Sequence, residues 1–273
     1  MHLENIQNLI QEHPQTTNLF KKNLVKEYLQ ILILSFIYGR ADYRDLVFYG
    51  GSCLKHCYGL PRLSEDLDFV DTSKEVNLKK LANELKKFLF KQLDIAPLLK
   101  VQKFRIYLKL PLLKKLELAD RQDSDLLFLK VEIFKQFDFC VASETQIIPI
   151  FKNNQTILVK SFDLPTLMAA KIRAVLNRQW GKTDKQGKVL VRAKGRDYYD
   201  LMWYLQKGIK PNLDCLLEIT NLEELKKKLL DNINKLDDQS IKLDLEALIV
   251  DQNLINDLSK NIKNILQTQI KNW

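Results

Sequence analysis

The stretch from Phe48 to Val70, FYGGSCLKHCYGLPRLSEDLDFV, joins a glycine-rich turn to a pair of aspartates. The apolar residues before the turn predict a short buried strand that runs into Gly50 and Gly51. Because glycine has no Cβ, the backbone can turn sharply here and approach a phosphate closely. Ser52 adds a hydroxyl and begins a predicted helix whose first amides would face an anion. The stretch therefore indicates a phosphate-binding turn between a strand and a helix.

Two carboxylates follow this predicted helix. Asp66 and Asp68 alternate with apolar residues, so an extended strand places both side chains on one face. Two carboxylates about 4 Å apart repel by about 4 kcal/mol at an effective dielectric constant of roughly 20, and a bound divalent cation removes this cost. Magnesium prefers such oxygen ligands together with substrate phosphates. We therefore expect a magnesium site beside the turn.

Taken separately, a Gly-Gly-Ser turn is often only a turn, and an Asp-Leu-Asp pair is often a strand end in solvent. Together, in strand-turn-helix-strand order, they resemble the signature of the polymerase-β-like nucleotidyltransferases. Arg62 and Ser64, in the pattern Arg-x-Ser-x-Asp-x-Asp, narrow the resemblance to the AbiEii-type toxin nucleotidyltransferases of abortive infection and type IV toxin-antitoxin systems. This resemblance implies an α/β (α+β) fold, in which a mixed sheet with helices precedes a mainly helical C-terminal lobe.

A later strand is predicted over residues 126–134, LLFLKVEIF, where apolar residues alternate with Phe128, Lys130 and Glu132. The pattern alone also suits an ordinary lysine-glutamate salt bridge at a sheet edge. The resemblance implies instead that Glu132 completes the metal site with Asp66 and Asp68, holding two magnesium ions.

Two helical motifs follow. Residues 163–178 predict a helix that begins after Asp163 and carries Lys171 and Arg178 on one side. A second helix opens with Arg196-Asp197-Tyr-Tyr-Asp200. From the residues alone, Lys171 suits a solvated helix face, and Arg196 with Asp200 suits a surface ion pair worth about 0.3 to 0.5 kcal/mol.

The resemblance assigns functions to these motifs, because the family carries a Leu-x-x-x-Lys helix and an Arg-Asp-x-x-Asp helix. Asp197 would orient Lys171, Arg196 or an acceptor group. The implied catalytic residues are Asp66, Asp68, Glu132, Lys171 and Asp197, and the implied nucleotide-binding residues are Gly51, Ser52, Arg62, Ser64, Lys171, Arg196 and Asp200.

Positive charge is concentrated between residues 171 and 196, which hold nine basic residues and one acidic residue. The centre of this segment contains two glycines and no helical period, which indicates a loop. Such a loop could be simply solvated, but its position favours RNA binding through lysine and arginine contacts to phosphates and aromatic stacking on a base. The predicted RNA-binding residues are Arg178, Trp180, Lys182, Lys185, Lys188, Arg192 and Lys194.

The whole chain has 273 residues, of which 46% are hydrophobic, enough for two lobes. We expect a catalytic lobe over residues 1–160, with N-terminal helices that include one from Thr17 to Tyr38, and a helical lobe over residues 161–273. No segment suits a membrane span or a signal peptide, so we expect a cytoplasmic protein. Four cysteines are too few for a disulfide framework and predict reduced thiols, and the Cys53, His56 and Cys57 group lacks a second half-site for zinc.

We therefore expect magnesium-dependent transfer of a nucleoside monophosphate from a nucleoside triphosphate to an acceptor hydroxyl. The resemblance implies that the acceptor is the 3′ end of tRNA, that the protein is a growth-inhibiting toxin, and that a cognate antitoxin regulates it. Two alternatives stay open. The acceptor could be a protein or a small molecule, or the chain could be an inactive nucleotidyltransferase scaffold that binds RNA as a regulatory module.

Overall fold

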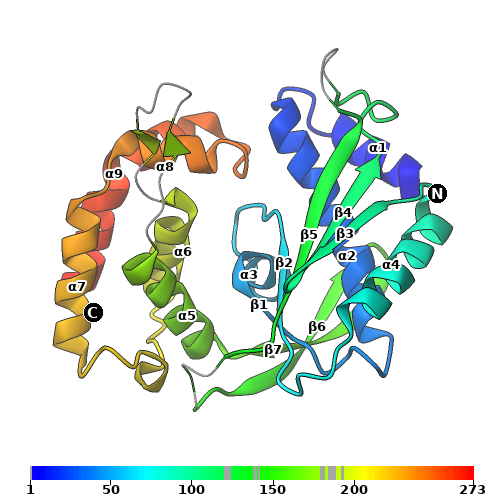
Figure 1. Cartoon of the computed structure of the whole chain (residues 1–273). Coiled ribbons are helices and arrows are strands. Elements are labelled where there is room, and N and C mark those ends of the chain that lie inside the picture. The colour runs from blue at the N-terminus through cyan, green and yellow to red at the C-terminus, as the bar shows by residue number, and fades with distance from the viewer. Residues whose placement is uncertain are drawn as a thin grey trace. The chain divides into compact units, whose positions relative to one another are not determined.

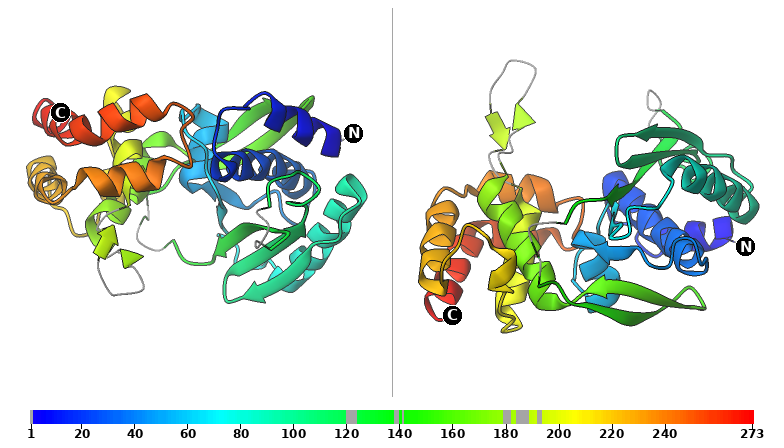
Figure 2. Two further views of the ribbon diagram at one scale, coloured as in Figure 1. Left: turned by 90° about the horizontal axis from the view of Figure 1, so that it is seen from above. Right: turned by 60° about the horizontal axis from the view of Figure 1, so that its bottom comes forward.

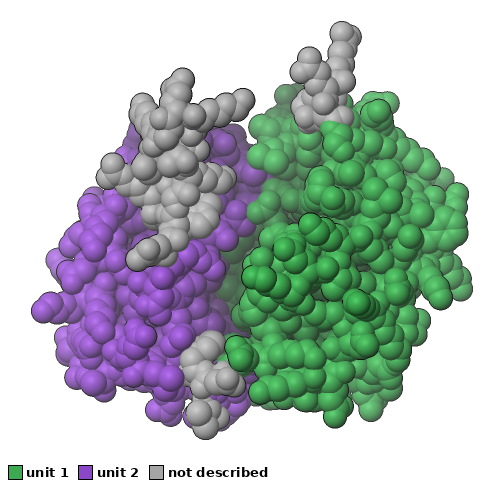
Figure 3. Space-filling view, in the orientation of Figure 1, with its two compact units in different colours: residues 1–137, 145–161 green, residues 138–144, 162–273 purple. Residues whose placement is uncertain are grey.

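The computed structural model describes residues 2–119, 124–137, 140, 142–178, 182–183, 189–191 and 194–273, with the main chain alone for 182–183 and 189–191. The chain divides into two compact units (Figure 3). The first unit contains residues 1–137 and 145–161, and the second contains residues 138–144 and 162–273. The boundary expected after residue 160 thus lies next to the structural division after residue 161, whereas the transfer of residues 138–144 to the second unit was not expected.

The first unit is built on a seven-stranded mixed sheet with the strand order β3-β4-β5-β2-β1-β7-β6 (Figure 1). The central pair β2 and β5 is parallel, whereas β1 with β2 and β4 with β5 are antiparallel. The elements of this unit are α1 (His2–Gln11), α2 (Asn18–Tyr38), β1 (Val47–Tyr49), α3 (Gly50–Tyr58), β2 (Leu67–Val70), α4 (Leu78–Leu93), β3 (Leu98–Gln102), β4 (Arg105–Pro111), β5 (Leu126–Phe134), β6 (Thr145–Lys152) and β7 (Gln155–Phe162).

Alternation along the strands separates a buried face of the sheet from an open one. Every second residue of β5 belongs to the core, and the buried members are Leu127, Leu129, Val131 and Ile133. Phe128, between two of them, is 50% exposed. Helix α4 packs against β3 and β4, and α2 packs against α4. Helix α2 begins after Thr17, whose side chain accepts a hydrogen bond from the Phe20 amide, as the sequence predicts.

The second unit is mainly helical (Figure 2). Helix α6 packs against α5, α8 and α9. A Cβ on Gly195 at the start of α6 would lie 2.8 Å from Ile241 Cα, so the main chains of α6 and α8 approach too closely for another residue. The elements are α5 (Leu164–Asn177), β8 (Lys182–Thr183), β9 (Val189–Val191), α6 (Gly195–Gln206), η1 (Leu213–Cys215), α7 (Leu222–Asn234), α8 (Asp238–Leu245) and α9 (Gln252–Lys271).

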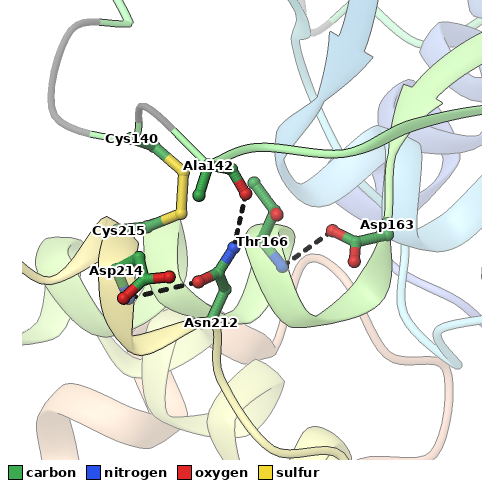
Figure 4. The surroundings of a disulfide bond; sticks show 7 residues. All are labelled: Cys140, Ala142, Asp163, Thr166, Asn212, Asp214 and Cys215. Carbon is green, nitrogen blue, oxygen red and sulfur yellow. Dashed lines mark hydrogen bonds between the residues drawn. A yellow bond between two sulfur atoms is a disulfide. The ribbon is translucent and has the colours of Figure 1, made fainter.

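A disulfide joins Cys140 to Cys215 within the second unit (Figure 4). Nearby, Asn212 Nδ2 donates a hydrogen bond of 2.9 Å to the carbonyl of Ala142. These contacts attach Cys140 and Ala142 to the helical part of the second unit, to which residues 138–144 belong. The expectation of reduced thiols is therefore wrong for this pair, because the number of cysteines cannot show that the fold brings residues 75 positions apart together. Cys53 and Cys57 are free.

The helices of the described part of the chain include none that is both long and apolar enough to cross a membrane.

The disulfide predicts a thiol count. Titration of the unfolded protein before reduction should find two thiols, those of Cys53 and Cys57, and four after reduction. Cys140→Ser is the control, because it releases Cys215 and should give three thiols with or without reductant. Four thiols in the unreduced wild-type protein would contradict the pairing.

Candidate active site

The turn between β1 and α3 is built around two glycines. Gly50 has φ +81°, in the left-handed region that favours glycine, and a Cβ there would lie 2.5 Å from Asp68 Oδ2. A Cβ on Gly51 would lie 2.8 Å from Arg62 Nη2 and 3.0 Å from Ser64 Oγ. Both glycines therefore allow motif side chains to approach the turn more closely than a larger residue would permit.

Buried side chains hold the turn in place. Ser52 is fully buried, and its hydroxyl donates a hydrogen bond to the carbonyl of Asp66. Arg62 is 2% exposed and donates to the carbonyl of Leu63 at 2.8 Å, while Ser64 accompanies it against Gly51. The structure thus places Arg62 and Ser64 as a support beneath the turn. Their contact with a nucleotide stays a prediction.

Strand pairing brings three carboxylates to one face of the sheet. Asp68 of β2 lies opposite Glu132 of β5 in the parallel ladder, and residues directly opposite one another point to the same face. Asp66 precedes Asp68 by two positions and therefore shares that face. We call Asp66, Asp68 and Glu132 the carboxylate triplet.

Two cations offset part of the charge of this triplet. Lys130 Nζ lies 2.6 Å from Asp66 Oδ2 and 3.8 Å from Glu132 Oε1. Arg105 of β4 donates through Nε to Glu132 Oε1 at 2.7 Å. Burial lowers the pKa of both basic groups, but the neighbouring carboxylates outweigh this effect, so the pKa of Lys130 and the pKa of Arg105 are both raised.

The donor chemistry of the carboxylate triplet fits a divalent metal ion. Its ligand atoms are carboxylate oxygens, the kind that magnesium prefers, and they come from adjacent strands. In the described part of the chain, however, no three acidic, histidine or cysteine side chains are placed to hold one metal ion together. Lys130 and Arg105 form ion pairs with oxygens of the carboxylate triplet, and a metal ion would bind the same oxygens.

In the second unit, ion pairs with buried carboxylates join α5 and the residue after it to α6. Lys171 Nζ lies 2.8 Å from Asp197 Oδ1 and 2.8 Å from Asp200 Oδ2. Arg178 Nη1 lies 2.6 Å from Asp197 Oδ2. Burial raises the pKa of Asp197, but the charges of Lys171 and Arg178 outweigh it and bring that pKa to about 2. The predicted lysine motif and the predicted acidic motif therefore meet in space.

Arg196 has a partner that the sequence analysis did not identify. Its amide donates to Asp244 Oδ2 at 2.9 Å, and its Nη2 lies 3.1 Å from Asp244 Oδ1. Asp244 belongs to α8, and no local signal links the two residues. Arg105 was missed for a related reason. The strict alternation of residues 104–110 predicts a strand, but it does not show that Arg105 lies opposite Glu132.

The predicted RNA-binding segment is described only in part. Lys182 lies in β8, which pairs with β9 in an antiparallel ribbon, so part of the predicted loop is regular structure. In the sequence, Arg178 precedes this ribbon and Lys194 follows it. Burial lowers the pKa of Lys194. The remaining predicted residues, Trp180, Lys185, Lys188 and Arg192, lie outside the described residues.

The Asp197 ion pairs predict an acid dependence of stability. Because the pKa of Asp197 falls from 3.8 to about 2 in the fold, the ion pairs stabilise the fold above about pH 4, and this contribution is lost as the pH falls toward 2. At about 1.4 kcal/mol per pKa unit, the contribution is about 2 kcal/mol. Asp197→Asn should therefore lower the unfolding free energy near pH 7 and flatten its dependence between pH 5 and 2, as measured by denaturant titration.

The control for this prediction is Asp257→Asn on the exposed side of α9. It should keep the wild-type pH dependence. Equal slopes for wild type and Asp197→Asn would show that the Asp197 ion pairs do not stabilise the fold.

Comparison with known proteins bears on the fold and the family. A family model described as "Nucleotidyl transferase AbiEii toxin, Type IV TA system" matches residues 36–269. JHP933 from Helicobacter pylori is similar in structure, with a TM-score of 0.51, 19% identity and coverage of 92% of each chain. MenT4, a nucleotidyltransferase toxin from Mycobacterium tuberculosis, has a TM-score of 0.57 at 11% identity and covers 97% of this chain and 88% of its own. No curated protein matches the sequence.

At these identities the two solved structures bear on the fold alone, and they confirm the predicted architecture of a mixed sheet with helices followed by a mainly helical region. The family match covers most of the chain and confirms the predicted resemblance. The chain therefore belongs to the AbiEii family of nucleotidyl transferase toxins from type IV toxin-antitoxin systems.

Proposed function

We propose that this enzyme transfers a nucleoside monophosphate from a nucleoside triphosphate to the 3′ hydroxyl of a tRNA, with magnesium as cofactor. The observation that carries the proposal is the carboxylate triplet, Asp66, Asp68 and Glu132, on one sheet face beside the glycine turn. Extension of its 3′ end would prevent a tRNA from accepting an amino acid, which accounts for growth inhibition by a toxin of this family. Nucleoside triphosphates and tRNA are both present in the cytoplasm, where we expect the reaction to occur.

The triphosphate is proposed to bind at the start of α3. Helix N-termini favour anions because their first amides have no partner within the helix, and the main chain at Gly51 lacks an obstructing Cβ. Ser52 donates to the main-chain carbonyl of Asp66, so it ties the phosphate turn to the main chain that carries the first carboxylate. Lys171, Arg196 and Asp200 stay predicted nucleotide-binding residues, and Asp197 a predicted catalytic residue, of the second unit.

Asp66, Asp68 and Glu132 would hold magnesium, which when bound lowers the pKa of the acceptor hydroxyl and neutralises charge on the phosphates. Before magnesium binds, two basic side chains of the chain itself act on these carboxylates. Lys130 and Arg105 offset the mutual repulsion of the carboxylate triplet and keep Asp66 and Glu132 oriented. Both groups are charged at neutral pH, and the carboxylates raise the pKa of each of them further.

Acceptors other than tRNA stay as alternatives, namely a protein side chain or a small molecule. An inactive RNA-binding module is disfavoured, since a chain that had lost catalysis would not need to keep three carboxylates and two compensating cations on one face. Membership of a toxin-antitoxin family implies a cognate antitoxin as partner.

The proposal is tested with Asp68→Ala. Wild-type protein incubated with total RNA, magnesium and each α-phosphate-labelled nucleoside triphosphate in turn should label a tRNA-sized band on a denaturing gel. Loss of Asp68 removes one metal ligand and should reduce labelling at least about 100-fold, because transition-state charge loses its stabilisation.

The matched control for this experiment is Asp45→Ala, which removes an exposed acid from the same unit. It should label RNA at the wild-type rate. Label on a protein or on a small molecule would show that this species, and not tRNA, is the acceptor. Undiminished transfer by Asp68→Ala would overturn the assignment of the site.

A further inference from the structure

The open face of the outer strands β3, β4 and β5 carries a group of basic and aromatic side chains. Phe128 of β5 is 50% exposed, whereas its neighbours Leu127 and Leu129 point to the other face and are buried. Lys109 lies directly opposite it in β4, with Nζ 5.3 Å from the centre of the Phe128 ring. Tyr107 and Lys100 form the next cross-strand pair. We call Lys100, Tyr107, Lys109 and Phe128 the basic sheet face.

Strand register connects this face to the carboxylate triplet. Lys100 lies opposite Tyr107, and Tyr107 lies opposite Lys130, which binds Asp66. At about 3.3 Å per residue and 4.8 Å between strands, the face extends roughly 13 Å along β5 from Glu132 and roughly 10 Å across to β3. It is therefore an extended surface that begins at the proposed site of chemistry.

The order of strands places this surface opposite the phosphate turn. The sheet runs β3-β4-β5-β2-β1, so β2 with Asp68 separates the basic sheet face from the turn after β1. A nucleotide bound at Gly51 and an acceptor bound on β4 and β5 would approach the carboxylate triplet from opposite sides. Transfer between two substrates at a shared metal site needs this arrangement, with the attacking and leaving oxygens on either side of the phosphorus.

We propose, resting on the proposed function, that the basic sheet face binds the single-stranded 3′ end of the acceptor RNA. Lys100 and Lys109 form no ion pair with the described residues, so their charge is available to phosphates. Phe128 and Tyr107 offer rings on which bases stack, a contact that tolerates any base. Glu132 is the one acid among the described residues at these cross-strand positions of β3, β4 and β5, so the surface favours a polyanion.

The proposal is tested by the double substitution Phe128→Ala with Lys109→Gln. Binding of a fluorescent single-stranded RNA with a 3′ hydroxyl is measured by anisotropy in EDTA over a series of salt concentrations. Loss of one stacking ring and one phosphate contact should weaken binding about tenfold or more and reduce the slope of log K against log salt by about 0.7.

The matched control removes an exposed phenylalanine and an exposed lysine from α4 of the same unit, as Phe90→Ala with Lys87→Gln. It should bind RNA as the wild type does. Thermal unfolding should show both double variants to be folded, since none of the four substituted residues is buried.

Binding in EDTA separates this inference from the proposed function. Asp68→Ala protein should bind the RNA with wild-type affinity although it transfers nothing. If the wild type labels RNA but the Phe128 and Lys109 variant binds and extends RNA normally, the basic sheet face is not the acceptor site and the proposed function stands. If the wild type does not bind the single-stranded RNA in EDTA, the basic sheet face is not the acceptor site, and the labelling assay alone decides the proposed function.

Discussion

The parallel pairing of β2 with β5 is the constraint on which the candidate site depends. It places Asp68 opposite Glu132 and Asp66 next to Lys130, so one ladder assembles like charges that repel one another. At separations near 4 Å such repulsion costs about 4 kcal/mol per pair in a partly screened environment. The fold offsets this cost locally, with Lys130 from β5 itself and Arg105 from β4.

The second unit also pairs its carboxylates with basic side chains, and these carboxylates are more deeply buried. Lys171 is held by two carboxylates of α6, and Asp197 is shared between Lys171 and Arg178. Buried charges tolerate the loss of a partner poorly, because the remaining charge is left without compensation. Lys171, which the sequence analysis predicts to be catalytic, is thus a structural contact between α5 and α6. Measuring folding and transfer on the same variant separates this structural role from the predicted catalytic one.

Local patterns in the sequence predicted what local physics determines. Alternation identified the face of β5 that carries Glu132, Thr17 marked the start of α2, and Asp163 marked the start of α5. Partners distant in sequence could not be predicted in this way. Arg105 meets Glu132, Arg196 meets Asp244 and Cys140 meets Cys215 only because strand register and helix packing bring them together. No single segment contains the information for these pairs.

The excursion of residues 138–144 means that the chain passes between its two units three times, after residues 137, 144 and 161. Each unit therefore consists of two separate segments of the chain. A cut of the gene near residue 160 would leave Cys140 and Ala142 on the fragment that encodes the sheet. The fragment that encodes the helices would then lack both residues. One recombination event could not exchange the helical unit for that of a relative, because a second piece lies inside the catalytic half. A chimaera that exchanges the helical unit therefore has to exchange residues 138–144 together with residues 162–273.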